Sequence, residues 1–183
     1  HKMFAWGVYT ICETMVFLEV GTGQNPSRFI LRIMATIWFE DIRIGDFFQF
    51  GPYHVRREEL VAFNARWDPL PIHLDDDAAR EKGLKSLTAS GQYTFCIKQY
   101  MLNDSEWKSA VIGALGFDEV RFPNPVYPGD TITLSIECLE TRPSRSKRDR
   151  GIVRFRFLLT NQTEEPVLEY LDTVMFSRRK EVE

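Results

Sequence analysis

The sequence has few of the residues that disulfide frameworks and metal centres need. Its 183 residues include three cysteines and three histidines. Cys12, Cys96 and Cys138 are odd in number, far apart and without the spacing of metal ligands. We therefore expect no disulfide framework, and a reducing compartment such as the cytoplasm fits this composition. The small number of histidines also argues against a histidine-rich metal site.

The chain also lacks an excess of charge of one sign and a long apolar run. Lys and Arg number 23 and Asp and Glu number 26, which gives a net charge of -3. That near balance argues against nucleic acid as the main partner. The apolar run MVFLEV is too short to span a membrane, and Glu13 and Glu19 interrupt any signal peptide. We expect a cytoplasmic protein that binds neither nucleic acid nor membrane.

The remaining composition is that of an ordinary globular domain with a real core. Hydrophobic residues make up 44% of the chain and charged residues 27%. A well-patterned sequence begins at MATIWFEDIRIGDFF, so we predict one domain over residues 34–183 and an N-terminal extension of uncertain origin over residues 1–33. Alternation predicts a strand from Thr36, a turn at Gly45 and Asp46, and a strand through FFQFGPYHV.

Three helices are expected in the middle of the chain. REELVAFNARW has near-helical apolar spacing, and its helix should stop at Asp68 because a proline follows. Asp75 or Asp76 can cap a short helix in DDDAAREKG, which ends at a glycine.

The third helix begins near Gly91, and Thr88 or Ser90 can cap it. Its apolar residues face several directions, so we expect this helix to be buried.

Four strands are expected after Trp107, in VIGALGFDEVRF, DTITLSIECLE, GIVRFRFLL and PVLEYLDTVMF. Their short connections indicate a mostly antiparallel sheet. One buried helix followed by long antiparallel strands is typical of the α+β class. A sheet wrapped around a single central helix is the hotdog architecture, which is our predicted fold.

The stretch WDPLPIH places a carboxylate and an imidazole on a stiff loop. Pro69 and Pro71 fix their own φ angles and restrict the residues before them to extended backbone. Asp68 and His73 are therefore held at a set separation, and such a pair can hydrogen-bond one water and move its protons. On the motif alone, a surface loop with a solvated histidine remains the alternative.

The surrounding sequence resembles a known family. FNARWDPLPIHLDDDAA is similar to the signature of the MaoC-like dehydratases, which include the (R)-specific enoyl-CoA hydratases. That signature has an aspartate, any residue, an amide residue, a proline, an aliphatic residue, a histidine and, six places later, a small residue. The matching residues are Asp68, Pro71, Ile72, His73 and Ala79. LTASGQYT, FPNPVYPGDTI and RPSRSKRDRG also resemble this family, and the similarity covers about residues 36–179.

The resemblance implies a hotdog hydratase or dehydratase that acts on a 2-enoyl or 3-hydroxyacyl thioester of CoA or an acyl carrier. Asp68 would be the catalytic base, while His73 would orient the water and return a proton to the α-carbon. The backbone N–H of Gly91, beside Ser90, would bind the thioester carbonyl. Leu70 stands where the family has its amide and would be an apolar wall of the substrate site. The resemblance implies no metal or redox cofactor, and a homodimer or dimer of dimers.

Two alternatives remain open. Hotdog thioesterases commonly place a carboxylate on the central helix, but residues 91–103 contain no Asp or Glu. A non-catalytic subunit that binds acyl thioesters is the second alternative, because Leu70 cannot make the hydrogen bonds of an amide. The basic run RPSRSKRDRG would suit phosphates, although such a run is more often a solvated hairpin tip.

Overall fold

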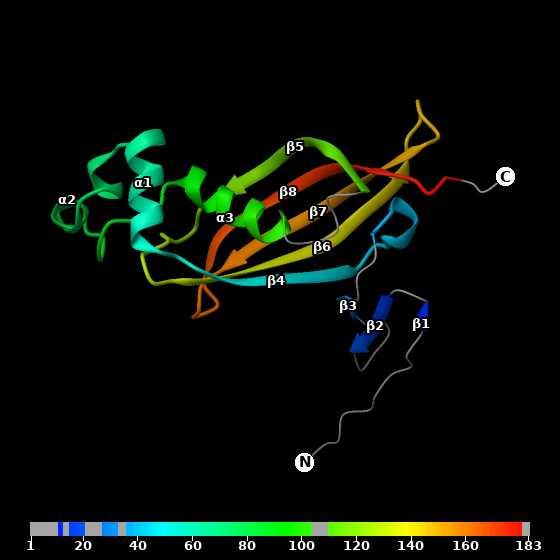
Figure 1. The fold of residues 1–183 in the computed structure, drawn as a ribbon, viewed down its shortest axis with the longest axis horizontal. Coiled ribbons are helices and arrows are strands. Elements are labelled where there is room, and N and C mark those ends of the chain that lie inside the picture. The colour runs from blue at the N-terminus through cyan, green and yellow to red at the C-terminus, as the bar shows by residue number, and fades with distance from the viewer. Residues whose placement is uncertain (1–10, 13–14, 21–26, 33–35, 104–109, 181–183) are drawn as a thin grey trace, which may run out of the picture.

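The computed structural model describes residues 11–12, 15–20, 27–32, 36–103 and 110–180 (Figure 1). None of the helices in these ranges is long and apolar enough to cross a membrane.

A curved antiparallel sheet of five long strands forms the body of the protein. Its strands lie in the order β4-β6-β7-β8-β5, and every neighbouring pair among them is antiparallel. Their bounds are β4 (Asp46–His54), β5 (Val111–Arg121), β6 (Thr131–Pro143), β7 (Arg150–Thr160) and β8 (Pro166–Ser177). The helix α3 (Gly91–Asn103) lies across one face of this sheet (Figure 1). This arrangement confirms the predicted α+β class and the sheet around a central helix.

The core lies between α3 and the sheet. Alternate side chains of β6 are buried, as period-two alternation requires, and β7 and β8 repeat this pattern. The helix contributes Tyr93, Ile97 and Met101, which are spaced four residues apart and therefore lie on one face. These three side chains belong to the hydrophobic core and hold α3 against the sheet along most of its length.

Three further strands lie in the N-terminal segment. They are β1 (Ile11–Cys12), β2 (Met15–Val20) and β3 (Ser27–Arg32). β1, β2 and β3 pair in antiparallel order, and β3 pairs in parallel with the edge of β4 through Arg28 and Phe29. The division of the chain at residue 34 stays a prediction.

The prediction of a strand from Thr36 is wrong. A 3₁₀ turn, Phe39–Asp41, occupies that segment instead. The Asp41 carboxylate accepts a hydrogen bond from the Trp38 N–H at 2.9 Å, and the Asp41 N–H donates to the Trp38 carbonyl at 3.0 Å. This local bonding offers the backbone an alternative to a strand. The turn expected at Gly45 is present, and its φ of +86° lies in the left-handed region that glycine tolerates.

The two helices that flank the proline loop agree with the sequence. α1 (Arg57–Trp67) ends before Asp68, as expected for a residue that precedes proline. In α2 (Asp76–Glu81), the cap is Asp75, whose carboxylate accepts from two backbone N–H groups of the first turn.

We expect Leu134→Ala to lower the free energy of unfolding by about 2–5 kcal/mol, because it leaves a cavity in the closed core. Leu134 is fully buried in the first half of β6. The adjacent Ser135 points to the opposite face of the strand and is only half-buried, so Ser135→Ala is the matched control. Urea denaturation measures both variants, and equal losses would contradict this account of the core.

Candidate active site

The loop between α1 and α2 holds its two candidate catalytic residues through its own backbone. The Asp68 N–H donates to the Asn64 carbonyl at 2.9 Å, which continues the bonding of α1. The Leu70 N–H then donates to the Asp68 carbonyl at 2.8 Å, and the His73 N–H donates to the Leu70 carbonyl at 2.9 Å. A single 3₁₀ turn, η2 (Pro71–His73), results, with a proline at its first position.

This loop brings the Asp68 carboxylate and the His73 imidazole together. Oδ2 of Asp68 lies 3.8 Å from Nε2 of His73. His73 is only 8% exposed, whereas the Asp68 side chain is about one-third exposed. The separation is too long for a direct hydrogen bond but suits a water molecule that bonds to both groups.

The far side of the imidazole fixes the tautomer of His73. Nδ1 lies 2.9 Å from the Thr88 carbonyl oxygen and 3.1 Å from the Thr88 hydroxyl. A carbonyl oxygen only accepts, so Nδ1 carries the hydrogen and donates it. In the neutral ring, Nε2 therefore has a lone pair, and that lone pair faces the side of Asp68. Two acceptors, a carboxylate oxygen and a ring nitrogen, thus stand opposite one another.

Asn64 ties this loop to the start of α3. Its Nδ2 donates to the carbonyls of His73, at 3.4 Å, and Thr88, at 3.3 Å. Its Oδ1 accepts a hydrogen bond from the Ser90 hydroxyl at 2.7 Å. Asn64 is fully buried, so one amide joins three segments away from water. The sequence reasoning did not identify Asn64 or Thr88 as part of the site.

A signal for Asn64 was present in the sequence. Asn64 is four residues after Leu60, so the two side chains lie on the same, buried face of α1. A buried amide must be hydrogen-bonded to offset its lost hydration. An amide on the apolar stripe of a helix therefore indicates polar partners in the core. Thr88 has no comparable signal.

Ser90 and Gly91 form the start of α3. The Ser90 hydroxyl is fully buried, donates to Asn64, and accepts a hydrogen bond from the Tyr93 N–H at 3.3 Å. Ser90 is therefore the cap of the helix, and it contributes to the site by fixing the helix start. The N–H of Gly91 belongs to the first turn, whose donors the helix itself leaves without partners.

A cleft of about 470 Å³ adjoins Gly91. Phe122 lies over this glycine so closely that an added Cβ would be 2.8 Å from the ring. Phe122 is 46% exposed, so its ring is not locked in a core. The described residues that line the cleft do not include Asp68 or His73. Within one chain, the acid–imidazole pair therefore does not line the cleft at Gly91, and the link between them runs through the side chain of Asn64.

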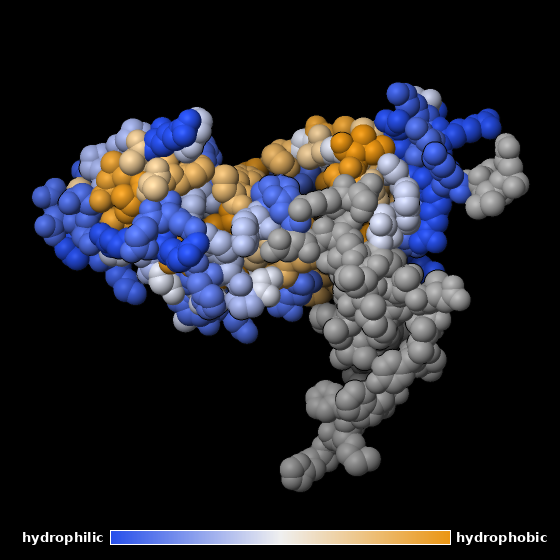
Figure 2. Space-filling view, viewed as in Figure 1, coloured by the Kyte–Doolittle hydropathy of each residue, from blue (hydrophilic) through white to orange (hydrophobic). Residues whose placement is uncertain are grey.

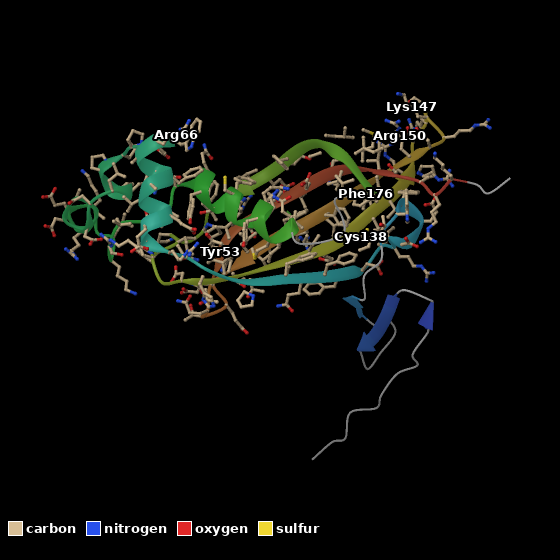
Figure 3. The ribbon with its side chains drawn as sticks, in the orientation of Figure 1. Tyr53, Arg66, Cys138, Lys147, Arg150 and Phe176 are labelled. Atoms are coloured by element: carbon tan, nitrogen blue, oxygen red, sulfur yellow. The ribbon has the colours of Figure 1, made fainter. Side chains whose placement is uncertain are left out.

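Leu70 and the basic run RPSRSKRDRG, which the sequence also singled out, lie at the surface. Leu70 is 52% exposed. The basic run lies at the hairpin that joins β6 and β7, where Figure 3 shows Lys147 towards the tip and Arg150 at the start of β7. That tip is at the opposite end of the long axis of the molecule from α1 (Figure 1). Among the residues that the structure describes, no group of three His, Cys, Asp or Glu is placed to hold a metal ion.

The chain belongs to the MaoC-like dehydratase family, a family of hydratases and dehydratases. The MaoC-like domain matches residues 41–156, which include α1, the loop and α3.

Individual relatives agree with this family. The MaoC-like dehydratase from Rhodospirillum rubrum is 34% identical, with a TM-score of 0.73 over 79% of this chain and 99% of that one. The uncharacterized protein YdeM of Bacillus subtilis (strain 168) is 25% identical over 140 residues, which are 76% of this chain and 98% of YdeM. Rv0216 of Mycobacterium tuberculosis has a double hotdog fold and shows the fold alone, with 17% identity and a TM-score of 0.65 over 81% of this chain and 46% of that one.

We expect Asn64→Ala to lower the free energy of unfolding by about 1–3 kcal/mol, because it leaves buried partners in three segments without their hydrogen bond. Asn124 is the matched control, since its amide makes one bond, to the Pro166 carbonyl at 2.9 Å, in a partly buried position. Asn124→Ala should cost less. Chemical denaturation of both variants measures the difference, and a smaller loss at Asn64 would contradict the linking role of its amide.

Proposed function

We propose that the protein adds water to a 2-enoyl thioester, or removes it from a 3-hydroxyacyl thioester. The observation that carries this proposal is the pair of facing acceptors, Asp68 Oδ2 and His73 Nε2, at 3.8 Å. A water between them donates one hydrogen to each group, which leaves a lone pair of its oxygen free for an electron-poor carbon. Membership in a family of hydratases and dehydratases supports the same reaction.

The proton balance of hydration follows from this arrangement. The oxygen of the water bonds to the β-carbon of the enoyl group as one acceptor takes a proton, and the α-carbon then receives a proton. Asp68 is our candidate base. His73 orients the water through Nε2. The proton that Asp68 takes then passes to Nε2 through a hydrogen-bonded hydroxyl or water, because the two groups are 3.8 Å apart, and His73 donates it to the α-carbon. The Thr88 carbonyl holds the ring in the orientation that this proton transfer needs.

The negative charge that develops on the thioester carbonyl oxygen needs a hydrogen-bond donor to stabilise it. Gly91 N–H at the start of α3 is our candidate, because the free N–H groups and the positive end of the helix dipole favour an oxyanion there. Phe122 would have to swing away from Gly91 to admit the carbonyl. The acyl handle is CoA or the arm of a carrier protein, and the reaction uses no redox cofactor.

We expect purified protein to consume crotonyl-CoA in water, with loss of the enoyl absorbance and no release of free thiol. Asp68→Asn should keep the fold and reduce turnover by about 10²–10⁴, since it removes the proton acceptor. Asp77→Asn is the matched control because Asp77 is 87% exposed on α2, and it should keep full turnover.

Other outcomes distinguish the alternatives. Release of free thiol would indicate a thioesterase, which the absence of Asp and Glu from the sequence of α3 disfavours. Binding of the thioester without turnover would indicate a non-catalytic subunit. Equal turnover by wild type and Asp68→Asn would remove the carboxylate from the mechanism.

We expect Leu70→Asn to raise kcat/KM for a short enoyl-CoA while it changes the unfolding free energy by less than about 0.5 kcal/mol. The backbone of Leu70 is already fixed by two hydrogen bonds, so an amide at this exposed position would act on the substrate rather than on the loop. Enzyme kinetics and thermal unfolding on the same sample test both parts. An unchanged kcat/KM would show that the family's amide is dispensable here.

We also propose that the protein is a homodimer. β5 is the last strand of the sheet, and it exposes apolar side chains that would otherwise face water, as Figure 2 shows along this edge. They are Ile112, Leu115, Phe117 and Val120, followed by Phe122 after the strand. A second copy pairing along β5 would cover both the unpaired edge and these side chains. It would also add walls to the open cleft beside Gly91.

We expect light scattering at micromolar concentration to give the mass of a dimer, and Leu115→Glu to shift it towards the monomer. Leu115 is 54% exposed on β5. Ile44→Glu is the matched control, since Ile44 is 68% exposed away from this strand. A wild-type monomer, or equal dissociation by both variants, would contradict pairing through β5.

A further inference from the structure

A lysine is buried in the middle of α3, outside the acid–imidazole pair. Lys98 is 5% exposed, and its only side-chain hydrogen bond among the described residues is to Gln99 Oε1 at 3.2 Å. The rest of its surroundings are aromatic. The ring centroids of Phe95, Phe117, Phe157 and Tyr170 lie 5.5–6.0 Å from Nζ. These ring faces stabilise the ammonium but, among the residues that the structure describes, leave most of its N–H donors without an acceptor.

Two acceptors in the same region also lack partners. Asp172, on β8, is 4% exposed, and its buried Oδ1 has no hydrogen bond within the described part of the chain. The buried hydroxyl of Tyr170 has none either. Burial raises the pKa of Asp172 to about 6, and Lys98 acts in the opposite direction, which places the two groups within electrostatic reach. Leaving such groups unpaired inside a protein is costly.

A cavity of about 280 Å³ opens between these groups. Lys98 and Asp172 both line it. Most of its other walls are apolar and come from α3, β5, β7 and β8: Leu102, Val111, Ala114, Phe117, Phe157 and Val174. Two amides of α3, Gln99 and Asn103, also line it, and Gln99 is already bonded to Lys98. The cavity therefore presents one ammonium donor and one carboxylate acceptor on a mostly apolar surface.

This combination selects a neutral polar group on an apolar body. A hydroxyl accepts from Lys98 and donates to Asp172, so it satisfies both. A carboxylate would meet the like charge of Asp172, and an ammonium that of Lys98. An ether accepts but cannot donate, so it would leave the Asp172 oxygen unpaired.

We infer that this cavity binds the far end of the acyl chain and favours a chain that ends in a hydroxyl group. This assignment to the acyl chain rests on the proposed function. Gly91 and Lys98 are seven residues apart, so they lie on the same side of α3, about 10 Å apart along its axis. Between them is Phe95, whose ring packs on Phe117 and Phe122. A chain held at Gly91 by its carbonyl reaches the cavity by passing this ring.

The first experiment tests the cavity without any thioester. Hexan-1-ol, pentyl methyl ether, hexanoate and hexylammonium are titrated into wild-type protein, and binding is followed by ligand-observed NMR. Hexan-1-ol should bind about tenfold more tightly than the ether, because it alone pairs both buried charges. The two ions should bind more weakly than the alcohol.

Variants then assign the preference to the two charged groups. Lys98→Met and Asp172→Asn should each bring the affinity for hexan-1-ol down towards that for the ether. Lys85→Met is the matched control, since Lys85 also lies over an aromatic ring, that of Tyr127 at 5.6 Å, but outside the cavity. Ala114→Leu, at an exposed cavity position, should weaken all four probes by filling space.

Equal binding of the alcohol and the ether by wild type would overturn the hydroxyl preference, whether or not the variants fold. No binding of any probe would overturn the cavity as a site. Retention of the preference in folded Lys98→Met would show that the lysine is a structural cation held by the aromatic rings.

The second experiment tests the link to the acyl chain. Wild type is given two enoyl-CoA substrates of equal length, one with a methyl end and one with a hydroxyl end. The hydroxyl-ended substrate should have the higher kcat/KM, and Lys98→Met should bring the ratio of the two kcat/KM values towards one. Turnover without discrimination would overturn the acyl assignment alone. No turnover of either substrate, with selective binding of hexan-1-ol intact, would instead overturn the proposed function and leave the hydroxyl site standing.

Discussion

The buried amide of Asn64 is the interaction on which the arrangement of the site depends. Its one nitrogen and one oxygen bond to His73, Thr88 and Ser90, so helix, loop and the start of the next helix share a single polar hub. Because Asn64 is fully buried, breaking any of these bonds would leave a buried polar group without its partner, so the amide couples the three segments. Asn64 thus holds the backbone of His73 and the cap of α3, while Thr88, which it also contacts, orients the imidazole.

The central helix buries polar groups in two different ways. At the start of α3, the buried Ser90 hydroxyl donates to Asn64 and accepts from the Tyr93 N–H, so it is paired on both sides. Around Lys98, the ammonium lies among aromatic rings, and the nearby Asp172 has an Oδ1 without a hydrogen bond in the described part of the chain. The first arrangement fixes the position of the helix start, and the second leaves donors and acceptors of hydrogen bonds without partners among the described residues. One helix thus has a hydrogen-bonded start and, in its middle, polar groups that are free to bind a ligand.

Much of the fold could be predicted because its signals are local. Alternation in β6, β7 and β8 and the apolar surface of α3 follow directly from side-chain period. The loop from Asp68 to His73 could be singled out because its prolines restrict the backbone. The turn at Phe39–Asp41 could not, since a side-chain hydrogen bond overrode the alternation. The contact of Thr88 with His73 and the position of Lys98 and Asp172 in one cavity could not be predicted either. Both bring together segments that are far apart in the chain, and a local sequence pattern does not report on such contacts.

The edge strand β5 is irregular as well as apolar. Its register with β8 shifts at three places, and Glu119 within it has a φ of +55°. An edge of this kind cannot serve as a flat template on which many chains stack, because each shift bends the row of free N–H and C=O groups away from a straight line. Its apolar side chains therefore carry a smaller risk of fibrillar aggregation than their exposure suggests.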